Sequence, residues 1–172
     1  MLKRNRALMV LAIVALACLA LGLGRLAAVG EWKVEVVSGD KSVVLTGADA
    51  AAMQAQTVKA AFLRSTGRID GPSVYAGIPV TAILERVGGL SPEQAIRVTA
   101  RDGYQMVYSY AQVHGGIFTY DSKGNVLRVG GPSMVLAFES ERDPADKLPR
   151  IIYGRPDGVL ITDGHFWAKA VA

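Results

Sequence analysis

Residues 65–89 read STGRIDGPSVYAGIPVTAILERVGG, and the second half of this stretch has the pattern of one amphipathic helix. Pro79 suits the first helical position, where no amide hydrogen bond is lost, and Gly88 and Gly89 accept the left-handed backbone that closes a helix. We predict a loop over residues 65–79 and a helix over residues 80–87. Its buried face has apolar residues at the i, i+3, i+4 and i+7 spacing, namely Val80, Ile83, Leu84 and Val87.

The first 30 residues differ from the rest of the chain. They hold four basic residues and no acid, and residues 7–24 form an unbroken run of apolar residues and glycine. Such a run is about the minimum that crosses a bilayer, and flanking positive charge stays on the cytoplasmic side. We expect a signal or anchor segment over residues 1–30 and one domain over residues 31–172 outside the cytoplasm. Cleavage after residues 28–30, which would secrete the domain, and lipidation at Cys18 stay open as alternatives to an uncleaved membrane anchor.

The charge of the 172-residue chain is a property of its N-terminus. The formal net charge of +4 lies wholly in residues 1–30, because the remaining 15 basic residues are balanced by 15 acidic ones. A neutral domain has no general field that attracts a polyanion, so we expect no nucleic-acid partner. Cys18 is the only cysteine. The expected domain therefore has neither a disulfide nor a thiolate for a metal, and packing must stabilise it.

Alternation of apolar and polar residues predicts many strands and few helices. Turn residues such as Asp102-Gly103 join several of these strands into hairpins. Many strands with only two or three short helices indicate an α+β domain on a mixed or antiparallel sheet. We predict a helix over 48–53 capped by Thr46, a charged loop over 141–146, and strands over 32–37, 42–46, 56–64, 96–100, 104–110, 117–120, 126–129, 134–139, 148–153, 158–162 and 166–171.

The YAGIPV segment at residues 75–80 resembles the W-x-G-x-P-L segment of the sulfite-oxidase-type molybdopterin-binding domain. Other segments follow in the order of that family: DGY at 102–104, YSYAQV at 108–113, GGIFTYDSKGN at 115–125, GGP at 130–132 and ITDGHFWAKAV at 161–171. The resemblance covers residues 56–171. It implies the α+β fold of that family, with mixed or antiparallel sheets and a few short helices.

The resemblance also bears on chemistry. Members of the family that carry the cofactor have a cysteine about a dozen residues before the glycine of that segment, and its thiolate ligates molybdenum. Counting back from Gly77 places Ser65 near that position. A serine hydroxyl is a much poorer ligand, because its pKa is too high for easy deprotonation. Molybdopterin thus remains a candidate cofactor, the cysteine ligand of molybdenum is absent, and we expect no metal site.

Candidate ligand-binding residues gather around Ser65 and in three other segments. Serine and threonine hydroxyls and a glycine-opened backbone suit an anion, and flanking arginines offer paired donors to a phosphate. Tyrosines on one strand face would form a wall beside a planar ligand. Ordinary surface and core roles are the alternative for each. The candidates are Arg64, Ser65, Thr66, Gly67, Arg68, Tyr75, Tyr104, which shares its strand face with Tyr108 and Tyr110, and His114, which lies beside Gly115-Gly116.

Other site chemistries have little support in the sequence. His114 and His165 have no carboxylate or cysteine at ligand spacing, so they do not predict a metal site. Ser109 has no histidine and aspartate arrangement around it that would activate a nucleophile. Catalytic residues stay unassigned.

These observations lead to one main hypothesis and two alternatives. The main hypothesis is a membrane-tethered, extracytoplasmic molybdopterin-binding-like domain that binds a small molecule, a pterin or a protein partner without molybdenum redox chemistry. The first alternative is a molybdopterin-dependent oxidoreductase with a redox partner in the membrane. The second is a structural envelope module whose site is vestigial.

Overall fold

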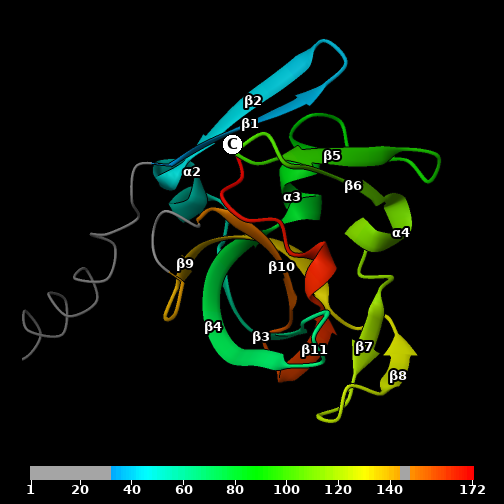
Figure 1. Ribbon diagram of the computed structural model, residues 1–172. Helices are drawn as coiled ribbons and strands as arrows, with labels where there is room; N and C mark the ends of the chain where they lie inside the picture. Colours follow the sequence, from blue (N-terminus) through cyan, green and yellow to red (C-terminus); the bar gives the residue numbers. More distant parts are fainter. Residues whose placement is uncertain (1–31, 144–147) are drawn as a thin grey trace, which may run out of the picture. The chain divides into compact units, whose positions relative to one another are not determined.

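The computed structural model describes residues 32–143 and 148–172 (Figure 1). These residues belong to the unit Glu31–Ala172, which is distinct from the unit Met1–Gly30. The expected N-terminal anchor therefore lies outside the described residues, as do residues 144–146 of the expected charged loop. Within the described part of the chain, no helix is long and apolar enough to cross a membrane.

Among the described residues, the largest element is a mixed sheet of seven strands in the order β10-β9-β4-β3-β11-β7-β8. β11 runs parallel to β3, whereas the other neighbouring pairs are antiparallel. The predicted strand-rich architecture with mixed sheets and short helices is confirmed at this level. The strands are β3 (Gln56–Leu63), β4 (Ile69–Pro79), β7 (Phe118–Tyr120), β8 (Val126–Val129), β9 (Ser133–Ser140), β10 (Arg150–Gly154) and β11 (Val159–Asp163).

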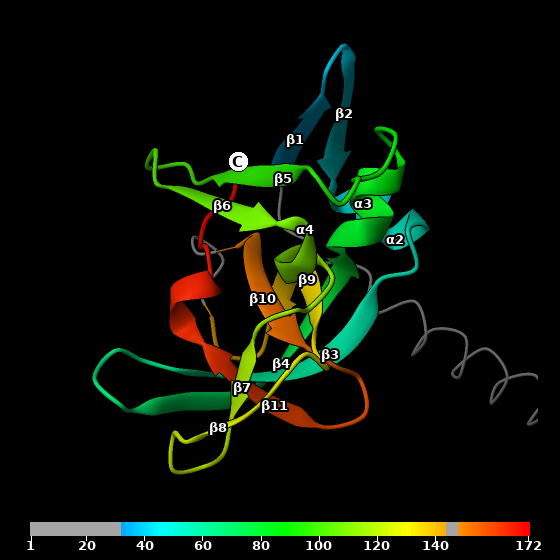
Figure 2. The ribbon, with the colours of Figure 1, turned by 90° about the vertical axis from the view of Figure 1, so that its right-hand side faces the viewer.

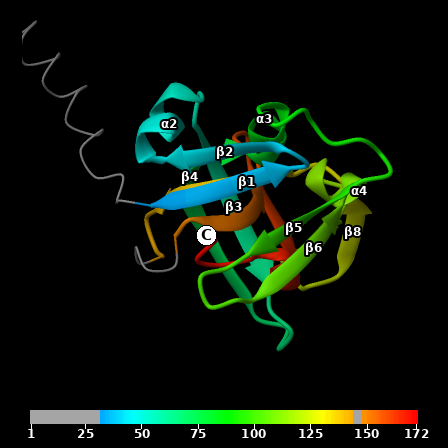
Figure 3. The same cartoon turned by 90° about the horizontal axis from the view of Figure 1, so that it is seen from above.

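Two antiparallel hairpins form separate two-stranded sheets in the described part of the domain. β1 (Lys33–Ser38) pairs with β2 (Lys41–Thr46), and β5 (Ala95–Thr99) pairs with β6 (Gln105–Ser109). The Asp102 carboxylate accepts a hydrogen bond from the Tyr104 amide at 3.0 Å, and Gly103 has a φ of 84°, so the predicted turn is confirmed. Figures 2 and 3 show both hairpins on the same side of the domain.

The start of the first described helix follows from local sequence, as predicted. α2 (Gly47–Ala52) begins after Thr46, whose amide and hydroxyl donate to the Asp49 carboxylate at 2.9 and 2.7 Å. This contact satisfies an amide that no helical carbonyl can reach.

The central helix is confirmed but is shorter than predicted. α3 (Val80–Glu85) continues into a turn in which the Gly89 amide donates to the Leu84 carbonyl at 2.9 Å. Gly88 and Gly89 have φ values of 107° and 84°, which side chains disfavour. The glycines therefore end the helix as the sequence predicts.

The predicted loop over residues 65–79 is wrong for most of its length. Residues 69–79 form β4, the longest described strand, which Figure 1 shows strongly bent. Its glycines are places of close strand contact. A Cβ on Gly77 would lie 2.5 Å from Val135 Cγ1 and 2.6 Å from the Leu136 carbonyl oxygen, and the register shifts beside it. Gly77 therefore lets β4 and β9 approach each other inside a strand, where a loop was predicted.

The predicted last strand over residues 166–171 is also wrong. Residues Gly164–Phe166 form a short 3-10 helix, η2, and only Val171 makes a bridge, to Ala100. Ala170 has a φ of 51°, which a continuous strand does not allow. A third difference is α4 (Tyr110–Val113), which begins where the predicted strand over 104–110 was expected to end.

The hydrophobic core lies where α3 packs against β4 and β9. The central residues of β9 are buried on both faces, as its apolar run predicts, and β10 is buried along its whole length. β10 begins with a charged residue, Arg150. A buried arginine at the start of an apolar strand needs hydrogen-bonding partners or an opposite charge. Arg150 is also one of the residues of the candidate site.

Candidate functional site

A pocket of about 390 Å³ opens where the β3–β4 turn, the first residue of β10 and the segment after β11 meet. Its volume falls within the range of small-molecule sites. We call it the basic pocket, because three cationic side chains and one carboxylate line it. The lining residues are Phe62, Arg64, Ser65, Thr66, Arg150, Asp163, Gly164, His165, Trp167 and Lys169.

The β3–β4 turn carries the first group of lining residues. The Arg64 amide donates to the Arg68 carbonyl at 2.8 Å, and the Gly67 amide donates to the Arg64 carbonyl at 2.9 Å. Gly67 has a φ of 81° and open space around its Cα, so it serves the turn's conformation. Ser65 and Thr66 stand exposed at the tip, where their hydroxyls are accessible to a ligand.

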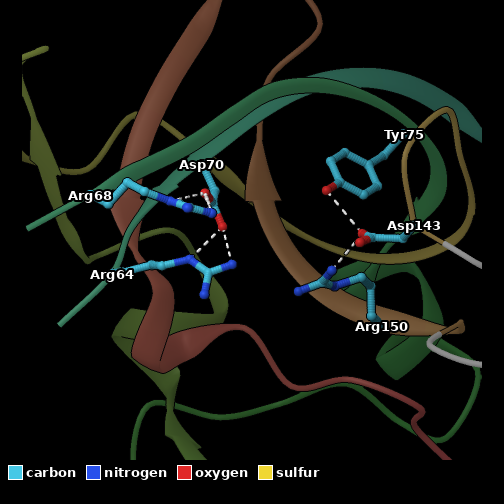
Figure 4. Close-up of polar contacts among 6 residues, drawn as sticks. All are labelled: Arg64, Arg68, Asp70, Tyr75, Asp143 and Arg150. Atoms are coloured by element: carbon cyan, nitrogen blue, oxygen red, sulfur yellow. Dashed lines mark hydrogen bonds and ion pairs between the residues drawn. The ribbon is translucent and has the colours of Figure 1, made fainter. Parts of the chain in front are cut away.

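Arg64 and Arg68 share one buried carboxylate (Figure 4). Arg64 pairs with Asp70, and Arg68 donates from Nε and Nη2 to Asp70 Oδ1 at 3.0 and 2.8 Å. Burial by itself would raise the pKa of Asp70, but the hydrogen bonds and charges of the two arginines outweigh it, so the pKa lies below its ordinary value. Arg64 lines the basic pocket and Arg68 does not. The two arginines are thus a natural matched pair for experiment.

Arg150 is the most unusual residue of the pocket. Its side chain is 2% exposed, its Nη1 donates to Asp143 Oδ2 at 2.5 Å, and its Cζ lies 5.1 Å from the centre of the Trp167 ring. Nε and Nη2 are buried and have no hydrogen-bond partner in the protein. A buried donor without an acceptor costs about 1–3 kcal/mol, and more when it is charged. A residue that lines the pocket therefore carries two buried cationic donors without a protein partner.

Asp143 also binds Tyr75, so its carboxylate lies between Tyr75 and Arg150. The Tyr75 hydroxyl donates to Asp143 Oδ2 at 3.1 Å (Figure 4). Burial raises the pKa of Tyr75 above its ordinary value, and the Asp143 carboxylate raises it further, so the phenol stays a donor. Tyr75 does not line the pocket. It acts on the pocket through Asp143 and Arg150.

Two aromatic rings, those of Phe62 and Trp167, form part of the pocket wall. Trp167 lies with its ring centre 4.6 Å from that of Phe62, and its Nε1 donates to the buried Thr162 hydroxyl at 2.9 Å. A Cβ on Gly164 would lie 2.6 Å from Phe62 Cδ2, so only glycine lets η2 approach β3 here. The Asp163 carboxylate accepts from the His165 amide at 2.8 Å, which anchors the start of η2.

Five of the eight predicted ligand residues do not line the basic pocket: Gly67, Arg68 and Tyr75, which lie near it, and Tyr104 and His114, which belong to other parts of the fold. Tyr104 is exposed in the β5–β6 turn, and the His114 Nδ1 donates to the Tyr110 carbonyl at 2.8 Å. The predicted aromatic wall does not form. Tyr108 is fully buried and donates to the Phe166 carbonyl at 2.9 Å, whereas Tyr110 belongs to α4 and stacks on His114 with ring centres 4.0 Å apart.

Several residues that line the pocket were not predicted from the sequence as ligand-binding residues. Asp163, His165 and Trp167 stood out in the C-terminal segment but gave no spacing that indicates a site. Arg150 carried a usable signal, because it directly precedes the apolar residues of β10, where a charge is rare.

The residues of the pocket fit an anion better than molybdenum. The turn offers the Ser65 hydroxyl, and none of the lining residues carries a thiol. Among residues 32–143 and 148–172, no group of three or more histidine, cysteine, aspartate or glutamate side chains is arranged to hold a metal ion. The orphan nitrogens of Arg150 are hard cationic donors, which suit phosphate or carboxylate oxygens.

Comparisons of the chain with protein-family models, with curated proteins and with solved structures find no match. The assignment of the site therefore rests on its geometry.

Proposed function

We propose that residues 31–172 form a molybdopterin-binding-like domain of the sulfite-oxidase type that binds a small anionic ligand in the basic pocket and performs no molybdenum redox chemistry. The observation that carries this proposal is Arg150, a buried guanidinium with two nitrogens that lack a partner beside a cavity of about 390 Å³. A ligand with two or more acceptor oxygens, such as a phosphate, would satisfy both nitrogens at once.

Net charge alone would be weak support for an anion site. Asp70 and Asp143 do not line the pocket, but each pairs with one of its arginines, so the local positive charge is partly cancelled. What favours an anion is the lack of another partner. The Asp143 bond and the Trp167 ring fix the guanidinium, and its two remaining donors are buried away from water without an acceptor in the protein.

Within this proposal the predicted residues have different roles. Arg64, Ser65 and Thr66 contact the ligand from the turn, and Gly67 shapes that turn. Arg68 and Tyr75 act indirectly, through Asp70 and Asp143. Tyr104 and His114 take no part.

The absence of a thiolate among the lining residues supports binding without molybdenum chemistry. A serine at the turn would have to ionise to ligate the metal, and its hydroxyl pKa makes that costly. Metal analysis of the full chain, expressed in a host that makes the cofactor, should find no stoichiometric molybdenum. Stoichiometric molybdenum would instead support the alternative of a molybdopterin-dependent oxidoreductase.

We also propose that the domain lies outside the cytoplasm, held at the cell membrane by residues 1–30 or released from it by cleavage. The support is the run of apolar residues over 7–24 with basic residues before it. Alkaline phosphatase fused after Ala172 should be active. An inactive reporter in an intact fusion would contradict this location.

The test of ligand binding compares two arginines that share Asp70. Titration calorimetry of the full chain with inorganic phosphate should show saturable binding that Arg64→Gln weakens about tenfold, since one charge-assisted hydrogen bond is lost. Arg68→Gln should bind like the wild type, because Arg68 does not line the pocket. Equal losses in the two variants would mean that Asp70 pairing, not ligand contact, explains the effect. No binding of phosphate at all would favour the structural module.

A further inference from the structure

A second cavity, of about 400 Å³, lies on the side of the domain that carries the two hairpins. Its floor is apolar and buried, with contributions from α3, β9 and β10 such as Ile83, Leu136 and Ile151. Its two flanks are β1 and β5. We call this cavity the hairpin groove.

The flanks of the hairpin groove are strand edges rather than strand faces. Five consecutive residues of β1, 34–38, and all five residues of β5 line it. Side chains alternate between the two faces of a strand, so a face would present only every second residue. Among the described residues, β1 pairs only with β2, and β5 pairs with β6 on one side. The groove therefore runs between two strand edges, whose backbone N–H and C=O groups can form hydrogen bonds with an added strand.

The chain itself already pairs with one end of the β5 edge. The Ala172 amide donates to the Thr99 carbonyl at 3.0 Å, the Arg101 amide donates to the Ala170 carbonyl at 2.8 Å, and Val171 bridges Ala100 in antiparallel orientation. Figures 1 and 3 show this end of the chain between β1 and β5. The β5 edge thus accepts an antiparallel strand, as residues 170–172 show beside residues 99–101.

The unpaired part of the edge is defined by the hydrogen-bond alternation. The Ala100 amide donates to the Tyr104 carbonyl on the β6 side. Because antiparallel strands alternate the direction of their backbone groups, Val98 and Ile96 also face β6, whereas the amides and carbonyls of Arg97 and Ala95 face the groove. These two residues are the acceptor and donor positions for an added strand.

We propose that the hairpin groove binds an extended segment of a partner protein, which adds antiparallel to β5 and carries an apolar residue at every second position. Side chains opposite Val98 and Ile96 would point to the apolar floor, and those opposite Arg97 would point to solvent. A strand seated between two edges must have both of its own edges free. Every described strand of this chain already pairs with a neighbour, so an unpaired partner segment fits the groove better than a folded second copy.

The test extends the full chain by six residues after Ala172, so that the probe strand is held beside the groove at high effective concentration. One extension alternates valine and threonine and begins with valine, which places valine opposite Val98 and Ile96. The matched control begins with threonine, and it has the same composition but turns its valines to solvent. The readouts are the amide hydrogen-exchange rates of Arg97 and Ala95 by NMR and the melting temperature.

The valine-first extension should slow exchange at Arg97 and Ala95 by about tenfold, as expected for one added backbone hydrogen bond, and should raise the melting temperature above that of the control. Equal effects of the two extensions, or none from either, would overturn the proposal. It would also be overturned if these amides were already protected in the unextended full chain, because this chain or a second copy would then fill the groove. Light scattering tells those two cases apart.

Discussion

The guanidinium of Arg150 lies over the ring of Trp167, with Cζ 5.1 Å from the ring centre, while its Nη1 is bound to Asp143. These two contacts fix the plane of a side chain that is 2% exposed. A desolvated cation over an indole ring gains up to about 2 kcal/mol, which offsets part of the cost of its burial. The remaining nitrogens, Nε and Nη2, are buried without a protein partner in a residue that lines the basic pocket.

Asp143, which pairs with Arg150, and Tyr75, which donates to Asp143, should differ in their importance for stability. Asp143→Asn removes the charge that compensates a buried arginine and should lower the free energy of unfolding by about 3–5 kcal/mol. Tyr75→Phe removes one hydrogen bond to the same carboxylate and should cost about 1 kcal/mol. Urea unfolding at pH 7 measures both. A larger loss from Tyr75→Phe would mean that the phenol, not the ion pair, organises this cluster.

Asp70 should make stability depend on pH in the acid range. Its pKa in the folded chain lies below the ordinary value of 3.8, because the hydrogen bonds from Arg64 and Arg68 outweigh the opposing effect of burial. The ionised carboxylate therefore contributes stability that is present above about pH 4 and is lost as the pH falls through the folded pKa. The difference in unfolding midpoint between wild type and Asp70→Asn should shrink below pH 4.

Asp157 is the control for that experiment. It pairs with Arg155 at 2.7 Å but is 77% exposed, so water screens the pair. Asp157→Asn should change the unfolding midpoint little at any pH. An acid dependence that is equal for the two variants would show that Asp70 has no special role.

Gly77 should tolerate a methyl group less well than Gly67. Gly77→Ala places a Cβ within 3 Å of Val135, Leu136 and Ala137 and should destabilise the domain by about 1–3 kcal/mol or more through overpacking. Gly67→Ala meets open space and only strains a φ of 81°, at a cost of about 1 kcal/mol. Thermal unfolding of the two variants ranks these costs. The reverse order would refute the close contact between β4 and β9.

The helix face predicted from sequence can be tested in the same way. Leu84 is buried in α3 and Glu85, its neighbour, is exposed. Leu84→Ala should cost about 2–5 kcal/mol, because the packed helix cannot close the cavity, whereas Glu85→Ala should change little. Equal shifts of the unfolding midpoint would mean that the face is wrongly assigned.

Local signals in the sequence were sufficient for elements whose ends are set by nearby residues. Thr46 and Asp49 start α2, and Asp102 and Gly103 turn β5 into β6, so a reader of the sequence finds both. β4 was missed because Gly71 and Gly77 look like breakers until their neighbours across the sheet are known. A Cβ on Gly71 would lie 3.0 Å from the Ala60 carbonyl oxygen. Long-range contact decides those positions.

The basic pocket was predictable only in part for the same reason. Arg64, Ser65 and Thr66 are adjacent in sequence, so a ligand-binding turn could be proposed. Arg150 and Trp167 reach that turn from strands and segments far along the chain, which no spacing reveals. Tyr104 and His114 were chosen for their chemistry alone, and the fold places them elsewhere.

The central claim is that the Arg150 nitrogens bind an anion, and NMR of the arginine Nε–H groups tests it most directly. The full chain is titrated with inorganic phosphate, and the Arg150 signal is assigned by its loss in Arg150→Lys. Arg155 serves as the internal control, because its Nε already donates to Asp157 at 2.7 Å. We predict a saturable shift of the Arg150 Nε–H signal with no shift at Arg155. An Arg150 signal that stays unchanged, or that moves linearly together with that of Arg155, would contradict the account.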